Sequence, residues 1–447
     1  MPTIPRSNYI PDSDLPFLLV ADDQSRIIEI PELRMVTASR NEPGLPSVGE
    51  IIPLPPGSDL FVLPDRIPYG YDPVEKRFFP LRTYQGKRVF PVAAFMPPAY
   101  TYLRHTAFIR ETGSDWLPLY AYAPVGFMDN QYYTTGIRVD SDIRQDLDQV
   151  DHEGIRHQGE LLAQRYPHNR LIQHIVKNCA FTYGCPAARN YVQHRWEAPL
   201  PTSVSCNARC LGCISLQDGS GLPVTQPRIT FVPTPDEIAE LIVPHLQTAD
   251  DPIGSFGQGC EGEPILQADT IAAAVRLIRN QTSRGIINVN SNMSLPSAIE
   301  TLCLAGVDSF RVSLNSAQPH YYQAYFRSPT YQLRDVMRSI EIAGKYNKWI
   351  SLNYFIFPGF TDTPDEIRAL TDLIRTFRID YIQMRNLNID PQMMTETLEL
   401  YTIMDQPIGI LNWMERIRAL FPYNPFGYFN PGAEKIRRIR QLEGHHE

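Results

Sequence analysis

The sequence predicts an α/β protein whose central part, residues 199 to 390, forms an open (β/α)6 barrel. After Pro199, short apolar segments alternate with longer segments of helical periodicity, which is the pattern of a parallel sheet with helices between its strands. Six strand–helix units are too few for a closed eightfold barrel, so we expect a partial, TIM-like one. Ligands of such sheets bind at the carboxyl ends of the strands, and we therefore expect the chemistry in loops that follow strands.

The strands of this barrel are expected near residues 201 to 205, 254 to 258, 286 to 290, 308 to 314, 349 to 357 and 380 to 385. Two of the intervening helices are predicted to begin with the same tetrapeptide, Thr-Pro-Asp-Glu, at residues 234–237 and 363–366. In this capping box, threonine accepts from a free N–H group, proline has the φ of a first helical residue, and glutamate reaches back to the cap.

Residues 1 to 158 are predicted to form a β-rich, proline-rich N-terminal domain. Many of the 40 prolines lie in this part of the chain, and proline collects in turns and at sheet edges because it lacks an N–H donor. The segment from residue 17 to residue 30 combines β-branched side chains with a central turn signal, which predicts strand, turn and strand.

The chain outside these two regions is predicted to be helical. Residues 159 to 198 are expected to form a helical bridge, with apolar positions at helical spacing from about Gly159 to Lys177. Residues 391 to 447 are expected to be a C-terminal helical extension, with helical periodicity around residues 408–420 and 434–442.

Charge and hydrophobicity argue against two classes of partner, nucleic acids and membranes. A net charge of −8 disfavours a general nucleic-acid surface, and the basic residues 435–440 are attributed to a solvated helix face. No run of about 18 apolar residues occurs, and the first 16 residues lack the basic and apolar parts of a signal peptide. We therefore expect a cytoplasmic protein with no membrane partner.

Three of the seven cysteines, Cys206, Cys210 and Cys213, have the spacing C-x3-C-x2-C after the first predicted barrel strand. Without an export signal, cysteines favour metal or redox chemistry over disulfides. Three thiolates in one loop can bind three irons of a [4Fe–4S] cluster, whose sites are normally filled by four cysteines, so one iron stays open to a ligand. The spacing also allows a zinc site completed by a distant histidine, or reduced core cysteines.

With this loop in this position, residues 199 to 390 resemble the radical S-adenosylmethionine (radical SAM) superfamily. The resemblance implies a [4Fe–4S] cluster at the three cysteines and S-adenosyl-L-methionine as second cofactor. The implied reaction is oxidoreductase-like: reductive cleavage of that cofactor to a 5′-deoxyadenosyl radical, which abstracts hydrogen from an unidentified small molecule or peptide. A reductant such as flavodoxin or ferredoxin is implied as partner. The competing interpretation is a non-enzymatic iron–sulfur or zinc protein with a structural or electron-transfer metal site.

The resemblance also implies cofactor contacts at later strand ends. Gly262, Glu263 and Pro264 match the family's Gly-Glu-Pro motif, which contacts the amino group of the cofactor's methionine, although the tripeptide alone is typical of a turn before a helix. Ser313 and Asn315, two positions apart and so on one side of a strand, are similar to the ribose-contacting segment. Asn315 could equally begin the next helix.

The remaining implied contacts involve the carboxylate and the adenine. Arg327 matches a position that in some relatives pairs with the cofactor carboxylate, and an exposed surface arginine is the alternative. Ile356 and Phe357 match an apolar segment against adenine, and core packing explains them equally well. Gly212 departs from the family, because many relatives have an aromatic residue before the third cysteine.

Two further sets of residues allow more than one interpretation. Cys179 and Cys185 could join Cys260 or Cys303 in an auxiliary cluster, but five intervening residues fit no standard spacing, and we predict structural cysteines. The end of the sixth strand carries polar residues that face either the substrate space or a polar strand exit, namely Gln383, Arg385, Asn386 and Asn388.

Overall fold

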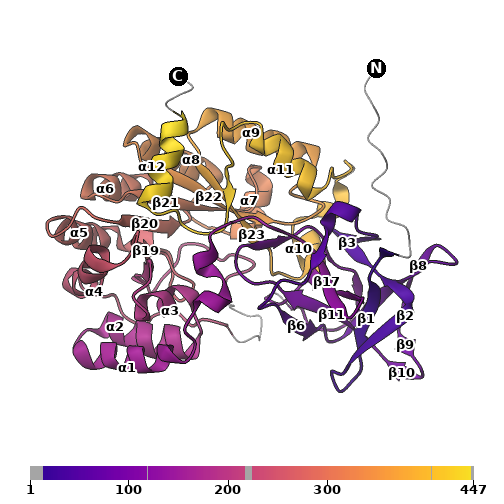
Figure 1. The fold of residues 1–447 in the computed structure, drawn as a ribbon. Helices are drawn as coiled ribbons and strands as arrows, with labels where there is room; N and C mark the ends of the chain where they lie inside the picture. The colour runs from indigo at the N-terminus through magenta and orange to yellow at the C-terminus, as the bar shows by residue number, and fades with distance from the viewer. Residues whose placement is uncertain (1–13, 118, 217–223, 404, 444–447) are drawn as a thin grey trace. The chain divides into compact units, whose positions relative to one another are not determined.

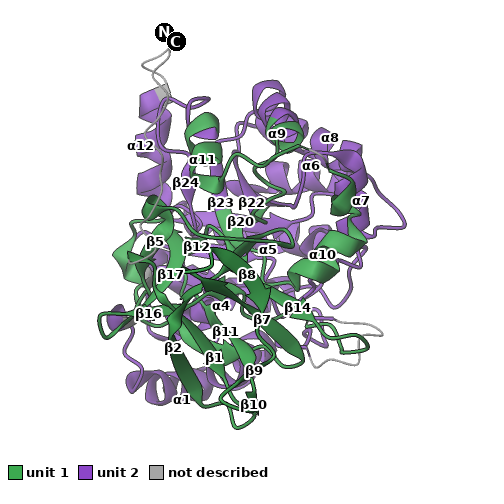
Figure 2. Ribbon diagram, turned by 90° about the vertical axis from the view of Figure 1, so that its right-hand side faces the viewer, with its two compact units in different colours: residues 1–147, 355–367, 384–416 green, residues 148–354, 368–383, 417–447 purple. Residues whose placement is uncertain are grey.

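The computed structural model describes residues 14–117, 119–216, 224–403 and 405–443, which fall into two compact units (Figure 2). Unit 1 comprises residues 1–147, 355–367 and 384–416, and unit 2 comprises residues 148–354, 368–383 and 417–447. The domain boundaries that we predicted after residues 158, 198 and 390 stay a prediction.

The strands of unit 1 are β1 (Phe17–Ala21), β2 (Ile27–Met35), β3 (Thr37–Ser39), β4 (Glu42–Gly44), β5 (Ile51–Pro53), β6 (Asp59–Val62), β7 (Arg66–Asp72), β8 (Arg77–Pro80), β9 (Thr83–Tyr84), β10 (Lys87–Arg88), β11 (Phe90–Phe95), β12 (Tyr100–Tyr102), β13 (His105–Thr106), β14 (Phe108–Arg110), β15 (Ala123–Pro124), β16 (Gly126–Met128) and β17 (Gln131–Arg138). Twelve of them form one sheet, with a central order β12-β17-β16-β1-β2-β7-β14. The predicted β-rich N-terminal region is therefore confirmed.

The first hairpin of unit 1 has the strand–turn–strand pattern that residues 17 to 30 predicted. Strand β1 pairs antiparallel with β2, and Ala21 lies opposite Ile27. The Asp22 carboxylate closes the turn by accepting the backbone N–H groups of Gln24 and Arg26, both at 3.0 Å. An aspartate that binds the backbone two residues ahead is a common turn device.

Unit 2 is built on a parallel sheet whose seven strands follow chain order. The strands are β18 (Glu197–Pro199), β19 (Ile253–Phe256), β20 (Ile286–Ser291), β21 (Ser309–Leu314), β22 (Trp349–Ile356), β23 (Tyr381–Asn386) and β24 (Phe426–Gly427). The α- and π-helices of the described residues are α1 (Gly154–Arg165), α2 (Arg170–His174), the π-helix η5 (Ile175–Thr182), α3 (Pro186–Val192), α4 (Pro235–Thr248), α5 (Ala268–Arg279), α6 (Pro296–Ala305), α7 (Pro319–Phe326), α8 (Leu333–Lys345), α9 (Pro364–Thr376), α10 (Pro391–Thr397), α11 (Ile410–Arg418) and α12 (Ala433–Glu443).

Four of these helices cover the outside of the unit 2 sheet. Figure 1 shows α4, α5, α6 and α8 in an arc outside strands β19 to β22. This curled sheet is the predicted partial TIM-like barrel.

Five of the six predicted strands lie where the sequence placed them, and the first does not. Residues 201 to 205 follow strand β18 instead of forming it. The reason is a side chain: the carboxylate of Glu261 accepts the N–H groups of Thr202 and Ser203 at 2.7 and 2.9 Å. Those two donors are therefore not available to a neighbouring strand.

Helix starts were predicted more accurately than helix continuity. Helix α4 begins at Pro235 behind a complete capping box of Thr234 and Glu237, and α9 begins at Pro364, as predicted. The single helix expected from Gly159 to Lys177 is wrong, because α1 ends before Pro167 and α2 starts after Asn169. Proline removes an N–H donor and restricts the residue before it, so the helix is interrupted there.

The C-terminal segment contains the two predicted helices, α11 and α12, and one strand that the sequence analysis missed. Strand β24 has two residues and pairs parallel to β23, with Ile382 opposite Phe426. It adds a seventh strand to a sheet for which six were predicted. A strand of two residues carries too little alternation to be recognised in a sequence.

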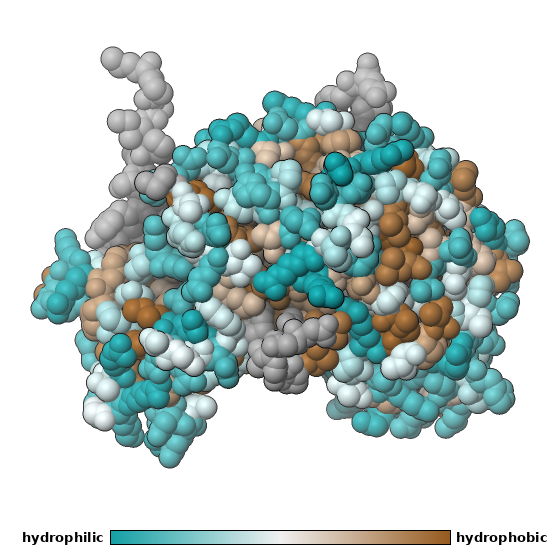
Figure 3. Space-filling model, turned by 180° about the vertical axis from the view of Figure 1, so that it is seen from behind, coloured by the Kyte–Doolittle hydropathy of each residue, from teal (hydrophilic) through white to brown (hydrophobic). Residues whose placement is uncertain are grey.

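No described helix is long and apolar enough to cross a membrane. Figure 3 shows a face on which hydrophilic residues predominate and hydrophobic residues form smaller, separate patches.

Candidate functional site

The loop with the three cysteines follows strand β18 in unit 2. Cys206, Cys210 and Cys213 form no disulfide and are partly exposed. The N–H groups of Arg209 and Leu211 each donate at 3.0 Å to carbonyl groups at the end of α7, those of Phe326 and Tyr325. The loop is thereby fixed to the barrel wall, with its thiols still accessible.

Each of the three thiols has a shifted pKa. Burial raises the pKa of Cys206 to about 11, and burial together with the two neighbouring thiols raises the pKa of Cys210 well above its usual value. Burial acts in the same direction on Cys213, but hydrogen bonds with Ser215 and Arg228 outweigh it and lower the pKa of Cys213. A metal would stabilise such thiols as thiolates.

The segment Gly262–Pro264 lies directly beside the residues that precede Cys206. The N–H of Gly262 donates to the Ser203 carbonyl at 2.7 Å, and the N–H of Glu263 donates to the Ser205 carbonyl at 2.8 Å. A Cβ atom on Gly262 would lie 1.9 Å from the Ser205 oxygen, so only glycine permits this approach. The structure thus brings two predicted motifs together, 49 residues apart in the chain between Cys213 and Gly262.

Glu263 is buried at the start of a short 3-10 helix, residues 264–267, in which Pro264 is the first residue. Its carboxylate accepts the Ser291 hydroxyl at 2.6 Å and the N–H of Asn292 at 2.9 Å, both at the end of β20. Burial raises the pKa of Glu263 to about 7, against the effect of these hydrogen bonds. The side chain is therefore a strong acceptor that a nearby cation would keep ionised.

Two residues of this site were missed by the sequence analysis. Glu261 is buried, and its two oxygens accept four backbone N–H groups: those of Thr202 and Ser203 already described and those of Gly257 and Gln258, at 2.8 and 2.7 Å. An acidic residue inside a glycine-rich turn could have indicated such a role.

The other missed residue is Asn207, between the first two cysteines. Its amide group donates to the Ser294 hydroxyl and accepts from the Asn292 amide, both at 2.8 Å. Asn207 therefore connects the cysteine loop to the loop that follows β20.

Ser313 and Asn315 lie at the carboxyl end of β21. Ser313 is half-buried, whereas Asn315 is 2% exposed and donates from Nδ2 to the Tyr321 carbonyl at 3.2 Å. The Oδ1 atom of Asn315 is buried and has no hydrogen-bond partner within the described part of the chain. A buried acceptor without a donor is costly, so this atom suits the hydroxyl group of a ligand.

The last three predicted contacts have separate surroundings. Arg327 is exposed and ends α7 in the left-handed region, with φ at 49°. Ile356 and Phe357 are buried, and in unit 1 the Phe357 ring stacks on His105 with centroids 5.9 Å apart. The hydroxyl of Tyr325 lies within hydrogen-bonding reach of the backbone of Gly212. Helix α7 therefore supplies an aromatic residue next to the third cysteine, where the sequence has glycine.

One face of the unit 2 sheet is polar, which the alternation along its strands could have shown. The Ser309 hydroxyl donates to Asn288 on the adjacent strand at 2.7 Å, and Arg311 donates to Gln383 at 3.1 Å. The residues between them, such as Val289 and Phe310, are buried and apolar. Barrel interiors are usually filled by branched apolar side chains, whereas the polar side chains of this face are hydrogen-bonded to one another.

Two residues at the end of β23 differ in what they contact. Gln383 belongs to this polar face and is 0% exposed. In unit 1, Asn386 accepts the N–H of Tyr102 at 2.9 Å and donates to the Tyr100 carbonyl at 3.0 Å. Asn386 therefore forms hydrogen bonds with backbone groups at the edge of strand β12, which explains why this residue is polar.

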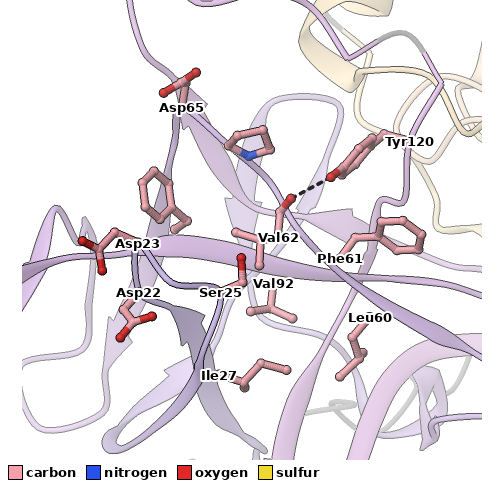
Figure 4. Close-up of a pocket in the computed structure, with 12 residues that line it drawn as sticks. Asp22, Asp23, Ser25, Ile27, Leu60, Phe61, Val62, Asp65, Val92 and Tyr120 are labelled. Atoms are coloured by element: carbon pink, nitrogen blue, oxygen red, sulfur yellow. Dashed lines mark hydrogen bonds between the residues drawn. The ribbon is translucent and has the colours of Figure 1, made fainter. Parts of the chain in front are cut away.

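Unit 1 also contains a hollow of about 550 Å³ (Figure 4). Its lining includes the carboxylates of Asp22, Asp23 and Asp65, and the Tyr120 hydroxyl donates to the Val62 carbonyl at 2.9 Å across one side. None of the predicted site residues lines it, and neither does any cysteine or histidine. We assign it no chemistry.

Residues 200–374 match the family model of the radical SAM superfamily, and this stretch includes the cysteine loop, Gly262–Pro264 and β21. The chain therefore carries a radical SAM domain. Enzymes of this superfamily generally use S-adenosylmethionine and a [4Fe–4S] cluster.

Two relatives share limited sequence with the chain. The GTP 3′,8-cyclase of Marinobacter nauticus is 28% identical over 192 residues, which cover 43% of this chain and 52% of the relative. The probable GTP 3′,8-cyclase of Methanosarcina mazei is 28% identical over 151 residues, which cover 32% of this chain and 42% of the relative. The chain thus spans about half the length of these relatives or less.

Among solved structures, a radical SAM methyltransferase from Sphaerobacter thermophilus is 17% identical with a TM-score of 0.32. The match covers 54% of this chain and 61% of the methyltransferase.

Proposed function

We propose that Cys206, Cys210 and Cys213 hold a [4Fe–4S] cluster and that the chain cleaves S-adenosyl-L-methionine reductively beside it. The observation that carries this proposal is the hydrogen-bonded contact between the cysteine loop and Gly262–Pro264. It supports a cluster and a cofactor-binding carboxylate in one site, since the two segments are otherwise distant in the sequence.

The donor set fits this group. Three thiols in one loop leave one iron of a cubane without a protein ligand, which is the position an amino acid-like cofactor would take. When bound, the cluster supplies one electron to the sulfonium, and the resulting 5′-deoxyadenosyl radical abstracts hydrogen from the substrate. The protein contributes binding, orientation and exclusion of water.

Each remaining residue has a proposed part in holding the cofactor. The Glu263 carboxylate, with Gly262 and Pro264 shaping its turn, accepts hydrogen bonds from the ammonium group, and this attraction lowers the raised pKa of Glu263. The unpartnered Oδ1 of Asn315 accepts a ribose hydroxyl, with Ser313 on the same strand edge. Arg327 pairs with the carboxylate, and Ile356 and Phe357 pack on adenine.

We further propose a small polar substrate, because the face of the sheet that carries Asn288, Arg311 and Gln383 is polar. The two cyclases act by name on GTP, a polar small molecule, which supports this size and polarity. We also propose flavodoxin or ferredoxin as reductant and the cytoplasm as location, since none of the seven cysteines, all of them among the described residues, forms a disulfide, and a reducing compartment keeps thiols in this state.

Spectroscopy of the reduced cluster tests this function. The protein is purified without oxygen, reconstituted with iron and sulfide, and reduced with dithionite. We expect about four irons per chain, and an electron paramagnetic resonance (EPR) signal that changes when S-adenosylmethionine is added. A cluster whose spectrum is unchanged at millimolar cofactor would contradict the proposal.

Matched variants assign the ligands. Cys206→Ala, Cys210→Ala and Cys213→Ala should each lose the signal, whereas Cys303→Ala should keep it. Cys303 is a buried cysteine in helix α6 and provides the control for removing a thiol.

A further inference from the structure

A second group of metal-binding side chains lies in unit 2, formed by His174, Cys179 and Cys260. One ligand atom from each lies within 4.8 Å of the others. Cys179 and Cys260 are 1% and 3% exposed, and their sulfur atoms are 3.5 Å apart. We propose that these three residues bind one zinc ion.

The separation of the sulfur atoms selects the kind of metal site. Two thiolates on one tetrahedral zinc, with Zn–S bonds of about 2.3 Å, are about 3.8 Å apart. The value of 3.5 Å is close to that, and it is far longer than the bond of about 2.05 Å in a disulfide. In a cubane the two thiolates would bind different irons and lie farther apart, so a single metal ion fits better.

His174 supplies a ring nitrogen to this group. Its Nε2 atom is buried and has no hydrogen-bond partner among the described residues. The ring is held edge-on against Phe231, with centroids 6.2 Å apart. Neutral imidazole is a common zinc ligand, and a metal would satisfy this nitrogen.

The backbone between His174 and Cys179 forms a rare type of helix that places both side chains on the same face. Residues 175–182 form a π-helix, whose hydrogen bonds run from residue i to residue i+5. His174 and Cys179 are five residues apart, so this winding brings them into line, whereas in an α-helix they would point about 140° apart. The sequence spacing alone therefore hides the pair.

Cys185 follows in the next turn but lies outside the group of three. Its N–H donates to the Cys179 carbonyl at 2.8 Å. Cys303 has neighbours of a different kind, Lys348 and Glu300, and takes no part. Of the two possible partners named from the sequence, the geometry selects Cys260.

Zinc at this position would tie two parts of unit 2 together. Cys260 lies in the loop after β19, three residues before Glu263, and the other ligands lie in the helical segment 170–185. The ion would be structural, because both of its thiolate ligands are buried and come from separate segments of the chain. The site does not depend on the cluster at Cys206, Cys210 and Cys213.

Metal analysis of the full chain tests the site. Protein purified without reconstitution should contain about one zinc per chain, and a variant with all three of Cys206, Cys210 and Cys213 changed to alanine should keep it. Cys179→Ala and Cys260→Ala should lower zinc at least tenfold, and the control Cys303→Ala should not.

Cobalt substitution gives a spectrum of the metal site itself, so loss of a ligand can be distinguished from misfolding of a variant. Wild-type protein loaded with Co²⁺ should show the intense visible bands of a tetrahedral site and the near-ultraviolet bands of cobalt–thiolate bonds, and Cys260→Ala should weaken the latter. Three results would overturn the proposal: zinc that persists in Cys179→Ala, wild-type protein that binds neither metal under reducing conditions, or a wild-type cobalt spectrum without thiolate bands.

Discussion

The two groups of cysteines in unit 2 differ in how the chain assembles them. Cys206, Cys210 and Cys213 lie within eight residues of one loop and are partly exposed. Cys179 and Cys260 are 81 residues apart and are both buried. An accessible set with one position left open suits a reactive centre, whereas a buried set with a histidine suits a structural ion. The predictions below test that division of roles.

The largest effect is expected from Gly262→Ala, which acts on the cysteine loop. The added methyl group would lie 1.9 Å from the Ser205 carbonyl and force the two segments apart. We expect iron content after reconstitution to fall severalfold and cofactor cleavage to fall at least about 100-fold, since small displacements of a site are costly. Iron analysis and product formation measure both.

Gly344→Ala is the matched control, because a Cβ atom there would meet no other atom within 4 Å. It lies inside helix α8, where alanine is the better helix former. Iron content and cleavage should be unchanged. If Gly262→Ala behaves like this control, the close contact at Ser205 is not needed.

The next effect is expected from Glu261→Gln. An amide nitrogen cannot accept the N–H groups that one carboxylate oxygen now accepts, so two buried donors lose their partner. We expect the free energy of unfolding, measured with urea, to fall by about 2–4 kcal/mol. Glu341→Gln, at an exposed ion pair with Lys345, should leave the unfolding midpoint unchanged. An unchanged midpoint for Glu261→Gln would refute the anchoring role of this carboxylate.

The smallest effect is expected from Asn315→Ala. Loss of one hydrogen bond between neutral groups should weaken S-adenosylmethionine binding about fivefold, measured by equilibrium dialysis without oxygen. The melting temperature is measured in parallel, since Asn315 also donates to the Tyr321 carbonyl. Unchanged affinity in a variant of unchanged stability would remove Asn315 from the ribose contact.

The features that could be predicted from the sequence were those encoded locally. The cysteine spacing, the capping box at Thr234 and five of six strands each depend on residues close in the chain. The first strand was misplaced because Glu261, about 60 residues later, takes the N–H groups of Thr202 and Ser203. Local patterns contain no information on such a partner.

The second cysteine group shows the same limit more strongly. His174 has no recognisable spacing to Cys179 in an α-helix, and only the π-helix aligns them. The buried Oδ1 of Asn315 is likewise visible only once the strand end is folded. The polar face of the sheet, in contrast, could have been predicted, because Asn288, Asn290, Ser309 and Arg311 alternate with apolar residues.

The most direct test of the central claim is whether the cysteine loop cleaves the cofactor. Reconstituted wild-type protein is incubated without oxygen with dithionite and S-adenosylmethionine, and 5′-deoxyadenosine is quantified by mass spectrometry. We predict that it forms with wild-type protein and with Cys303→Ala but not with Cys210→Ala. Wild-type protein that holds four irons yet yields no 5′-deoxyadenosine, or equal yields from Cys210→Ala, would contradict the account.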